Sequence, residues 1–225
     1  MGDIVGVIPD LHIPAHKKGA LDFIERTFNQ YKVDKVLFIG DLVDHHYIGF
    51  HPNETDALNP VQEWEAAAME LKKWIKAFPD AMLCYGNHDE RPGRAAQIMG
   101  LPEDVFLKTF NEVYSIPRTW SWKVRWDFGG VFYEHGLGSN GMYGAKNTAL
   151  KLGSAYVQGH THAHAAVFDI VQARNRFSAM NVGCLVDKEM YNFRYARKFF
   201  KVEMSLGCGI VLAPDDMKFV PFKEG

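Results

Sequence analysis

The chain has 225 residues, 47% of them hydrophobic, and a formal net charge of −2. This length and composition allow one sizeable core, so we expect a single domain spanning residues 1–225. The charge gives no overall attraction for polyanions, and no apolar run reaches the length of a membrane span, so we expect a cytoplasmic protein that makes no membrane contact. Three widely spaced cysteines are typical of reduced thiols and not of a disulfide framework.

Five short runs rich in Val, Ile, Leu, Phe and Tyr are typical of buried strands. They cover residues 4–9, 35–39, 81–85, 131–134 and 154–158. Polar residues follow each run directly, and most of them are opened or closed by a glycine. Because α/β proteins bind ligands outside the carboxyl ends of their strands, we expect these polar residues to meet along one rim.

Helices are predicted between the strands. Residues 61–78 carry apolar side chains at near-helical spacing and lie between Pro60 and Pro79, which mark the start and end of the helix. Residues 21–31 form a shorter helical pattern. The alternation of strands and helices indicates an α/β fold.

Two further stretches are predicted to border the rim as loop or cap segments, at about 45–60 and 91–117, the second with one or two short helices. Residues 205–212 and 217–222 flank the turn residues Pro214-Asp215-Asp216 and are predicted to form a closing hairpin. Strands and helices followed by strands alone favour a two-sheet β-sandwich flanked by helices.

Five polar motifs occur in a fixed order. They are Asp10-Leu11-His12, Gly40-Asp41-Leu42-Val43-Asp44, Gly86-Asn87-His88-Asp89, Glu134-His135-Gly136 and Gly159-His160-Thr161-His162. Clustered imidazoles and carboxylates suit Mn, Fe, Zn and similar ions, whereas Mg and Ca prefer oxygen ligands. A His-x-His pair alone is often an ordinary surface feature, but four further motifs that each follow an apolar run make coincidence a poor explanation.

This series of motifs, between residues 10 and 162, resembles the pattern of the calcineurin-like metallophosphoesterase superfamily. The resemblance implies the four-layer fold of that superfamily and a metal-dependent phosphoester hydrolase with a dinuclear metal centre. Asp41 would be shared by the two ions. By position, one ion would be bound by Asp10, His12, Asp41 and His162, and the other by Asp41, Asn87, His135 and His160.

The resemblance also implies a mechanism. Two divalent transition-metal ions, with Mn preferred and Fe, Zn, Ni or Co as alternatives, would clamp the phosphate and supply a metal-bridging hydroxide as the nucleophile. The catalytic imidazole falls on His88, which would protonate the leaving oxygen, and its orienting carboxylate falls on Asp44. The alternatives are that Asp44 is a helix N-cap and that His88 is a buried histidine without a catalytic role.

Four residues beside the motifs are candidates for substrate binding. Arg91 and Arg94 follow the third motif, where guanidinium groups could grip a phosphate, although solvated helix-start residues are an equal alternative. His45 and His46 follow the second motif and are interpreted as substrate contacts or, equally, as exposed loop residues. Related Ser/Thr protein phosphatases carry Arg-Gly there, and the missing arginine argues against that activity.

The substrate is predicted less narrowly than the reaction. A phosphodiesterase is favoured, because Asp89 in the third motif is shared with nuclease and cyclic-nucleotide branches. A phosphomonoesterase and a catalytically weak metal-binding interaction module are the alternatives. The expected partner is a phosphoester, such as a nucleotide or nucleic acid. Basic and aromatic residues alternate at 118–126 and 194–201, which suits single-stranded nucleic acid but is more typical of half-buried strands. The oligomeric state is left open.

Overall fold

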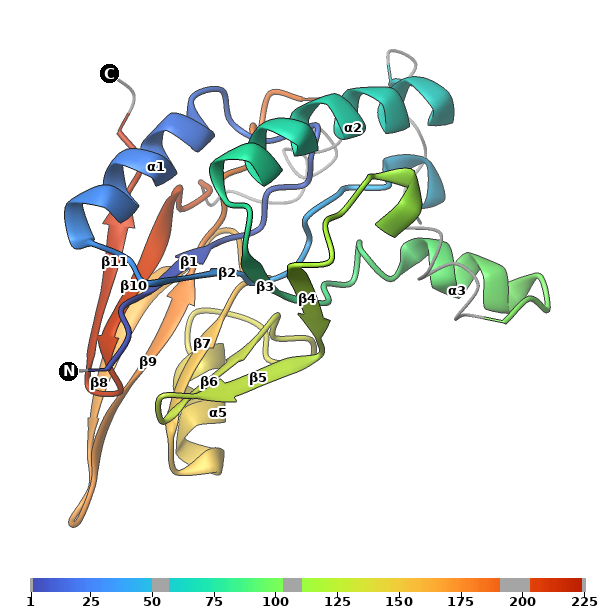
Figure 1. Ribbon diagram of the computed structural model, residues 1–225. Coiled ribbons are helices and arrows are strands. Elements are labelled where there is room, and N and C mark those ends of the chain that lie inside the picture. Colours follow the sequence, from blue (N-terminus) through green and yellow to red (C-terminus); the bar gives the residue numbers. More distant parts are fainter. Residues whose placement is uncertain (1, 50–56, 103–110, 191–202, 224–225) are drawn as a thin grey trace.

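A computed structural model describes residues 2–49, 57–102, 111–190 and 203–223 (Figure 1). Its first sheet has six strands in the order β11-β10-β1-β2-β3-β4. Strands β1 to β4 run parallel, while β10 and β11 pair antiparallel at one edge. The strands are β1 (Val5–Ile8), β2 (Lys35–Phe38), β3 (Ala81–Cys84), β4 (Trp120–Lys123), β10 (Gly207–Ala213) and β11 (Asp216–Pro221).

The second sheet has five strands in the order β5-β6-β7-β9-β8. Its three central strands are parallel, and each edge strand pairs antiparallel with its neighbour. The strands are β5 (Arg125–Phe128), β6 (Val131–Glu134), β7 (Ala155–Gln158), β8 (Ala165–Val171) and β9 (Arg176–Val182).

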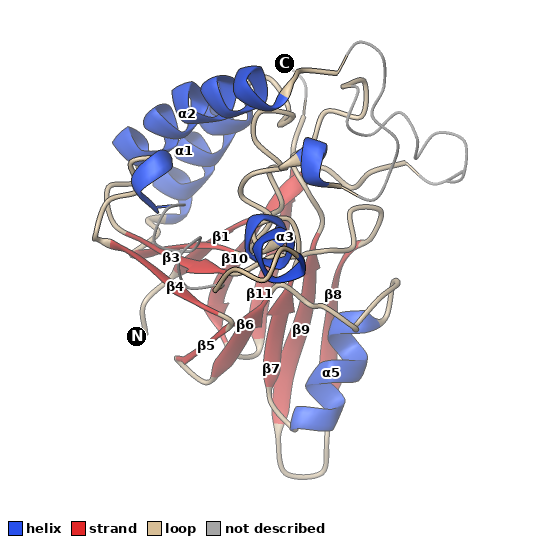
Figure 2. Ribbon diagram, turned by 90° about the vertical axis from the view of Figure 1, so that its right-hand side faces the viewer, coloured by secondary structure: helices blue, strands red, loops and turns tan. Residues whose placement is uncertain are grey.

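Helices cover the outer faces of the two sheets (Figures 1 and 2). Helices α1 (Ala20–Tyr31) and α2 (Pro60–Ala77) lie over the first sheet, and α5 (Gly144–Leu152) packs on β7 and β9 of the second. The short helices η1 (His46–Ile48) and α3 (Arg91–Ile98) contact each other. The predicted α/β sandwich of two sheets flanked by helices is confirmed.

The alternation of side chains along the central strands builds two cores. Ile8 and Phe38 point to the helices, in one cluster with Trp74 of α2, while Val7 and Leu37 belong to the core that includes the second sheet. At Gly6, a Cβ atom would overlap the ring of Phe28 in α1. Glycine at this position therefore lets α1 pack closely on β1.

Most predicted elements are confirmed close to their expected bounds. The helices expected at 21–31 and 61–78 are α1 and α2, and the closing hairpin is β10 and β11. Asn59 caps α2 in a capping box that is followed by Pro60, which explains why this helix begins where it does. Helix α5 and strands β8 and β9 were not predicted.

The predictions about the basic and aromatic runs divide between described and undescribed residues. The run at 118–126 forms the edge strands β4 and β5, where Lys123 lies over the ring of Trp126 and Arg125 over that of Phe132. Its interpretation as strands is confirmed. The run at 194–201 lies outside the described residues. Parts of the two predicted loop or cap segments, 50–56 and 103–110, also lie outside them.

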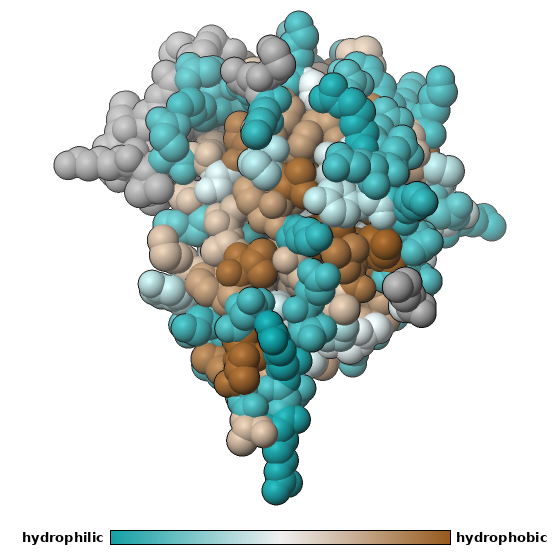
Figure 3. Space-filling view, turned by 90° about the vertical axis from the view of Figure 1, so that its left-hand side faces the viewer, coloured by the Kyte–Doolittle hydropathy of each residue, from teal (hydrophilic) through white to brown (hydrophobic). Residues whose placement is uncertain are grey.

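All three cysteines are buried and free, as predicted for reduced thiols. Within the described parts of the chain, no helix has the length and apolar character needed to cross a membrane. On the face at the left of Figure 1, hydrophobic residues are crossed by hydrophilic side chains and do not form one continuous apolar surface (Figure 3).

Candidate metal centre

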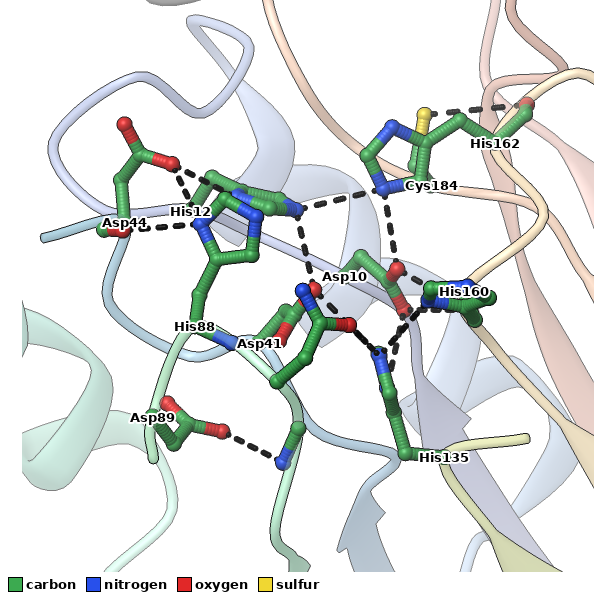
Figure 4. Close-up of polar contacts among 12 residues, drawn as sticks. Asp10, His12, Asp41, Asp44, His88, Asp89, His135, His160, His162 and Cys184 are labelled. Atoms are coloured by element: carbon green, nitrogen blue, oxygen red, sulfur yellow. Dashed lines mark hydrogen bonds and ion pairs between the residues drawn. The ribbon is translucent and has the colours of Figure 1, made fainter. Parts of the chain in front are cut away.

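The five motifs converge where the two sheets meet (Figure 4). Each one begins within three residues after the end of a strand, or at its last residue. The first sheet contributes Asp10 and His12 after β1, Asp41 after β2 and Asn87 after β3, and the second contributes His135 after β6 and His160 and His162 after β7. The expected rim is therefore present, and it draws on both sheets.

Glycines let the loops of this rim come close to one another. A Cβ atom at Gly86 would overlap the backbone nitrogen and the carboxylate of Asp41. A Cβ atom at Gly159 would overlap the carboxylate of Asp10. At both positions, any side chain would push apart the loops that carry the converging carboxylates.

Several site residues adopt a backbone conformation that side chains disfavour. The φ angles of His12, Asp41 and His160 are 49°, 51° and 65°. A non-glycine residue in this left-handed region costs on the order of 1–3 kcal/mol where the surroundings impose it, and such residues concentrate at functional sites. The presence of this conformation at three of the converging residues is a second indication that this rim is the functional site.

The first ligand cluster contains Asp10, His12, Asp41 and His162, whose candidate ligand atoms all lie within 4.8 Å of one another. Nε2 of His162 lies 3.0 Å from Oδ2 of Asp10 and 3.2 Å from Nε2 of His12. Nε2 of His12 also lies 3.5 Å from Oδ2 of Asp41. Two carboxylates and two imidazoles thus point their ligand atoms at one small volume.

The second ligand cluster contains Asp41, His135 and His160, again with ligand atoms within 4.8 Å of one another. Nε2 of His135 lies 3.3 Å from Oδ2 of Asp41, 3.1 Å from Oδ1 of Asn87 and 3.2 Å from Nδ1 of His160. Asp41 therefore belongs to both clusters. The structure brings together all seven residues predicted to bind metal.

The direction of the imidazole lone pairs tests whether cations fit this site. Nδ1 of His135 lies 3.2 Å from the carbonyl oxygen of Ile39, which can only accept, so Nδ1 carries the proton. The lone pair of Nε2 then faces Oδ1 of Asn87 and Oδ2 of Asp41, which are acceptors too. Facing lone pairs repel unless a proton or a cation lies between them. The donor set therefore fits a divalent ion of the type that binds imidazole and carboxylate.

The charge of the site leads to the same conclusion. Burial alone would lower the pKa of His135, but the carboxylates of Asp41 and Asp10 outweigh it and raise this pKa to about 10. Burial opposes ionisation of Asp41, yet the neighbouring imidazoles hold its pKa well below the usual range. Ionised, buried carboxylates give the site a negative potential that attracts cations.

A third group joins His12, Asp44 and His88. Nδ1 of His12 and Nδ1 of His88 each lie 2.9 Å from Oδ1 of Asp44 (Figure 4). Nδ1 of His88 also lies 2.8 Å from the carbonyl oxygen of Asp44. The interpretation of Asp44 as a helix N-cap is wrong, because the helix that follows begins at His46 with His45 as its N-cap.

The two candidate arginines hold the backbone of the site. Arg91 donates from Nη1 to the carbonyl oxygens of Asp44 (2.9 Å) and His45 (3.2 Å), and its Nη2 lies 3.0 Å from Nε2 of His88. Arg94 donates to the carbonyl oxygen of Asn87 at 2.6 Å. Neither is a purely solvated helix-start residue. Arg91 is the one whose guanidinium reaches an imidazole of the site.

The two candidate histidines are buried, so their interpretation as exposed loop residues is wrong. Nδ1 of His45 lies 3.0 Å from the carbonyl oxygen of His88, and its Nε2 lies 3.1 Å from the hydroxyl of Tyr114. Burial lowers the pKa of His45 to about 4. His46 is the first residue of η1, and its Nδ1 lies 3.9 Å from Oδ2 of Asp44.

Two buried carboxylates beside the site were not predicted as site residues. Asp89 accepts from the backbone nitrogens of Leu42 (3.0 Å), Val43 (3.3 Å) and Gly86 (3.0 Å), and so joins the second motif to the third. Glu63 of α2 accepts from the backbone nitrogen of His46 at 2.7 Å. A glutamate in the first turn of a helix is so common that its position carries no signal for this role.

The sequence profile described as calcineurin-like phosphoesterase matches residues 4–164, more than half of the chain. Comparison with curated proteins gave no match. Vacuolar protein sorting 29 from Cryptosporidium parvum is 13% identical, with 99% of each chain covered and a TM-score of 0.44. The nuclease MPE from Pseudomonas putida is 13% identical, with 96% of this chain and 86% of that chain covered and a TM-score of 0.39. At these TM-scores the likenesses carry no argument.

Proposed function

The chain belongs to the calcineurin-like phosphoesterase family, and from this premise we propose that it is a phosphodiesterase with a dinuclear metal centre. The observation that carries the proposal is the place of Asp41, whose carboxylate belongs to both groups of converging ligand atoms. A carboxylate within reach of both groups would offset the repulsion between two neighbouring cations. The proposed ligands are the six residues of the two clusters described above together with Asn87, whose Oδ1 lies 3.1 Å from Nε2 of His135.

The donor set also bears on the identity of the metal. Imidazoles supply four of the seven ligand side chains, His12, His135, His160 and His162, which favours Mn over Mg, with Fe, Zn, Ni or Co as alternatives. The chemistry that two such ions supply when bound is neutralisation of charge on the phosphoryl oxygens and a water-derived nucleophile at neutral pH.

The side chain proposed to donate a proton is His88. Its Nδ1 is held by the carboxylate and the carbonyl oxygen of Asp44, which orients the ring, so that in the imidazolium form Nε2 would carry the proton for the leaving oxygen of the substrate. Nη2 of Arg91 lies 3.0 Å from this Nε2, so a substrate oxygen that binds His88 also comes within reach of the guanidinium. We therefore keep Arg91 as a substrate-binding residue, and assign Arg94 to holding the backbone at Asn87.

The preference for a diester rests on the position after Asp44. His45 occupies it, and with a pKa near 4 its buried imidazole is neutral at physiological pH. A dianionic monoester has more to gain from a cation there than a monoanionic diester has. The neutral side chain at position 45 therefore adds no further cation beside Arg91, which favours diesters, such as nucleotide or nucleic acid linkages.

The test compares two chromogenic substrates after metal-free protein has been reconstituted with Mn²⁺ or Mg²⁺. We expect a higher kcat/KM for bis(p-nitrophenyl) phosphate than for p-nitrophenyl phosphate at the same pH, and greater activity with Mn²⁺. A tenfold preference for the monoester would make the phosphomonoesterase the better assignment. Metal binding without turnover of either substrate would favour the interaction module.

A further inference from the structure

One carboxylate oxygen links the first ligand cluster to the proposed proton donor. Oδ1 of Asp44 lies 2.9 Å from Nδ1 of His12 and 2.9 Å from Nδ1 of His88. The Asp44 side chain is only 2% exposed, so this carboxylate is held between the two imidazoles inside the protein. The two rings meet edge to face, with centroids 4.3 Å apart.

The hydrogen bonds fix the tautomer of both rings. An ionised carboxylate can only accept, so each Nδ1 must carry a proton. In a neutral imidazole the lone pair is then on Nε2. For His12 that atom faces the cluster, 3.5 Å from Oδ2 of Asp41 and 3.2 Å from Nε2 of His162. The hydrogen bond to Asp44 therefore presents the ligand atom of His12 to the cluster.

The imidazole ring of His12 also needs a hydrogen-bond partner that holds its orientation, because of the backbone conformation of this residue. Its φ angle of 49° is one that non-glycine residues disfavour, so the main chain alone does not favour the observed placement of the ring. A carboxylate that fixes the far nitrogen of a metal-binding imidazole sets its orientation and raises its basicity. Asp44 is such a carboxylate for His12, since its Oδ1 lies 2.9 Å from Nδ1 of the ring.

We propose that Asp44 is a positioning residue for the first ligand cluster, through His12, as well as for His88. The inference rests on the proposed function only in requiring that the clusters bind metal. Because both imidazoles lie 2.9 Å from the same carboxylate oxygen, a change at Asp44 affects the placement of both rings.

The experiment measures binding of Mn²⁺ alone to metal-free protein by calorimetry, for the wild type, Asp44→Asn and His88→Ala. The amide of asparagine keeps the shape of the side chain but is a weaker acceptor. We expect Asp44→Asn to weaken one of two sites about 10- to 100-fold, as loss of an outer-sphere partner of a metal ligand does. The other site serves as the internal control for folding and should keep its affinity.

The matched control is His88→Ala, which removes the other partner of the same carboxylate and should leave both Mn²⁺ affinities in place. Two unchanged affinities in Asp44→Asn would overturn the inference, and so would equal weakening of both sites. If Asp44→Asn does not fold, Asp44→Glu keeps the charge but displaces the oxygens, and an unchanged first site in it would equally overturn the inference. A wild type that binds no Mn²⁺ would instead count against the proposed function.

Discussion

The two ligand clusters are braced in different ways. In the first, Nδ1 of His12 is held by the side chain of Asp44, which also holds His88. In the second, Nδ1 of His135 is held by the backbone carbonyl oxygen of Ile39, directly after β2. One brace is a side chain that substitution can remove, and the other belongs to the main chain of the sheet. In the first cluster a ligand therefore shares its supporting residue with the proposed proton donor, whereas in the second the ligand depends on the backbone of the sheet.

The largest loss of bound metal and of activity is expected from Asp41→Asn. This carboxylate belongs to both clusters, so its loss affects both of them alike. Asparagine tolerates the φ angle of 51° at this position, so the fold should be retained. We expect loss of both ions, measured by elemental analysis after dialysis, and hydrolysis no faster than in excess chelator. Retention of two ions would contradict the sharing of Asp41.

Removing one histidine from each cluster should separate them. We expect His162→Ala to weaken the first site and His160→Gly the second, with the remaining ion still bound in each variant. Glycine is chosen at position 160 because the φ angle there is 65°. Calorimetry with Mn²⁺ measures the outcome. Loss of both ions from either variant would mean that the clusters do not bind independently.

His88→Ala should remove no ion yet slow the reaction, because His88 belongs to neither of these two clusters. A positioned acid contributes on the order of 10²- to 10⁴-fold. Steady-state rates should show this loss for a diester with a poor leaving group and a smaller loss for nitrophenolate, which departs without a proton. Equal losses for both leaving groups would assign His88 to phosphate positioning instead.

The convergence of the site could be predicted from sequence, because it follows from the order of strands and motifs. Apolar runs place Asp10, Asp41 and His135 after strands, and glycines mark the tight turns between them. The braces could not be predicted. Nothing in the local sequence indicates that His45 is buried or that Arg91 donates to the backbone at Asp44 and His45, since both features depend on how distant loops pack.

Some helices and strands were not predicted for a similar reason, because they depend on tertiary packing. Helix α5 is short and leaves Leu150 and Leu152 exposed, so its apolar residues do not mark one buried face, and it is stabilised by packing on the second sheet. Strands β8 and β9 form one long antiparallel pair after the last motif. Their pairing with each other and with β7 is a tertiary outcome that overrides weak local preference.

The smallest effect is expected from Glu63→Gln, and it concerns the pH dependence of the free energy of unfolding. Burial raises the pKa of Glu63 from 4.5 to about 6, so the folded state holds this proton to higher pH than the unfolded state does. Stability from this group is therefore full below pH 4.5 and falls by about 2 kcal/mol as pH rises to 6 and above. Urea unfolding should show this fall in the wild type relative to Glu63→Gln. Parallel pH profiles would contradict it.

The left-handed backbone at His12, Asp41 and His160 also limits which residue types can replace them. At these positions glycine, asparagine and aspartate fit the main chain, whereas β-branched side chains do not. Chains that lose a ligand here and still fold should therefore carry a narrow set of replacements, while His135 and His162 should tolerate a wider one. Saturation mutagenesis scored by abundance, without any assay of activity, should reveal this difference in mutational tolerance.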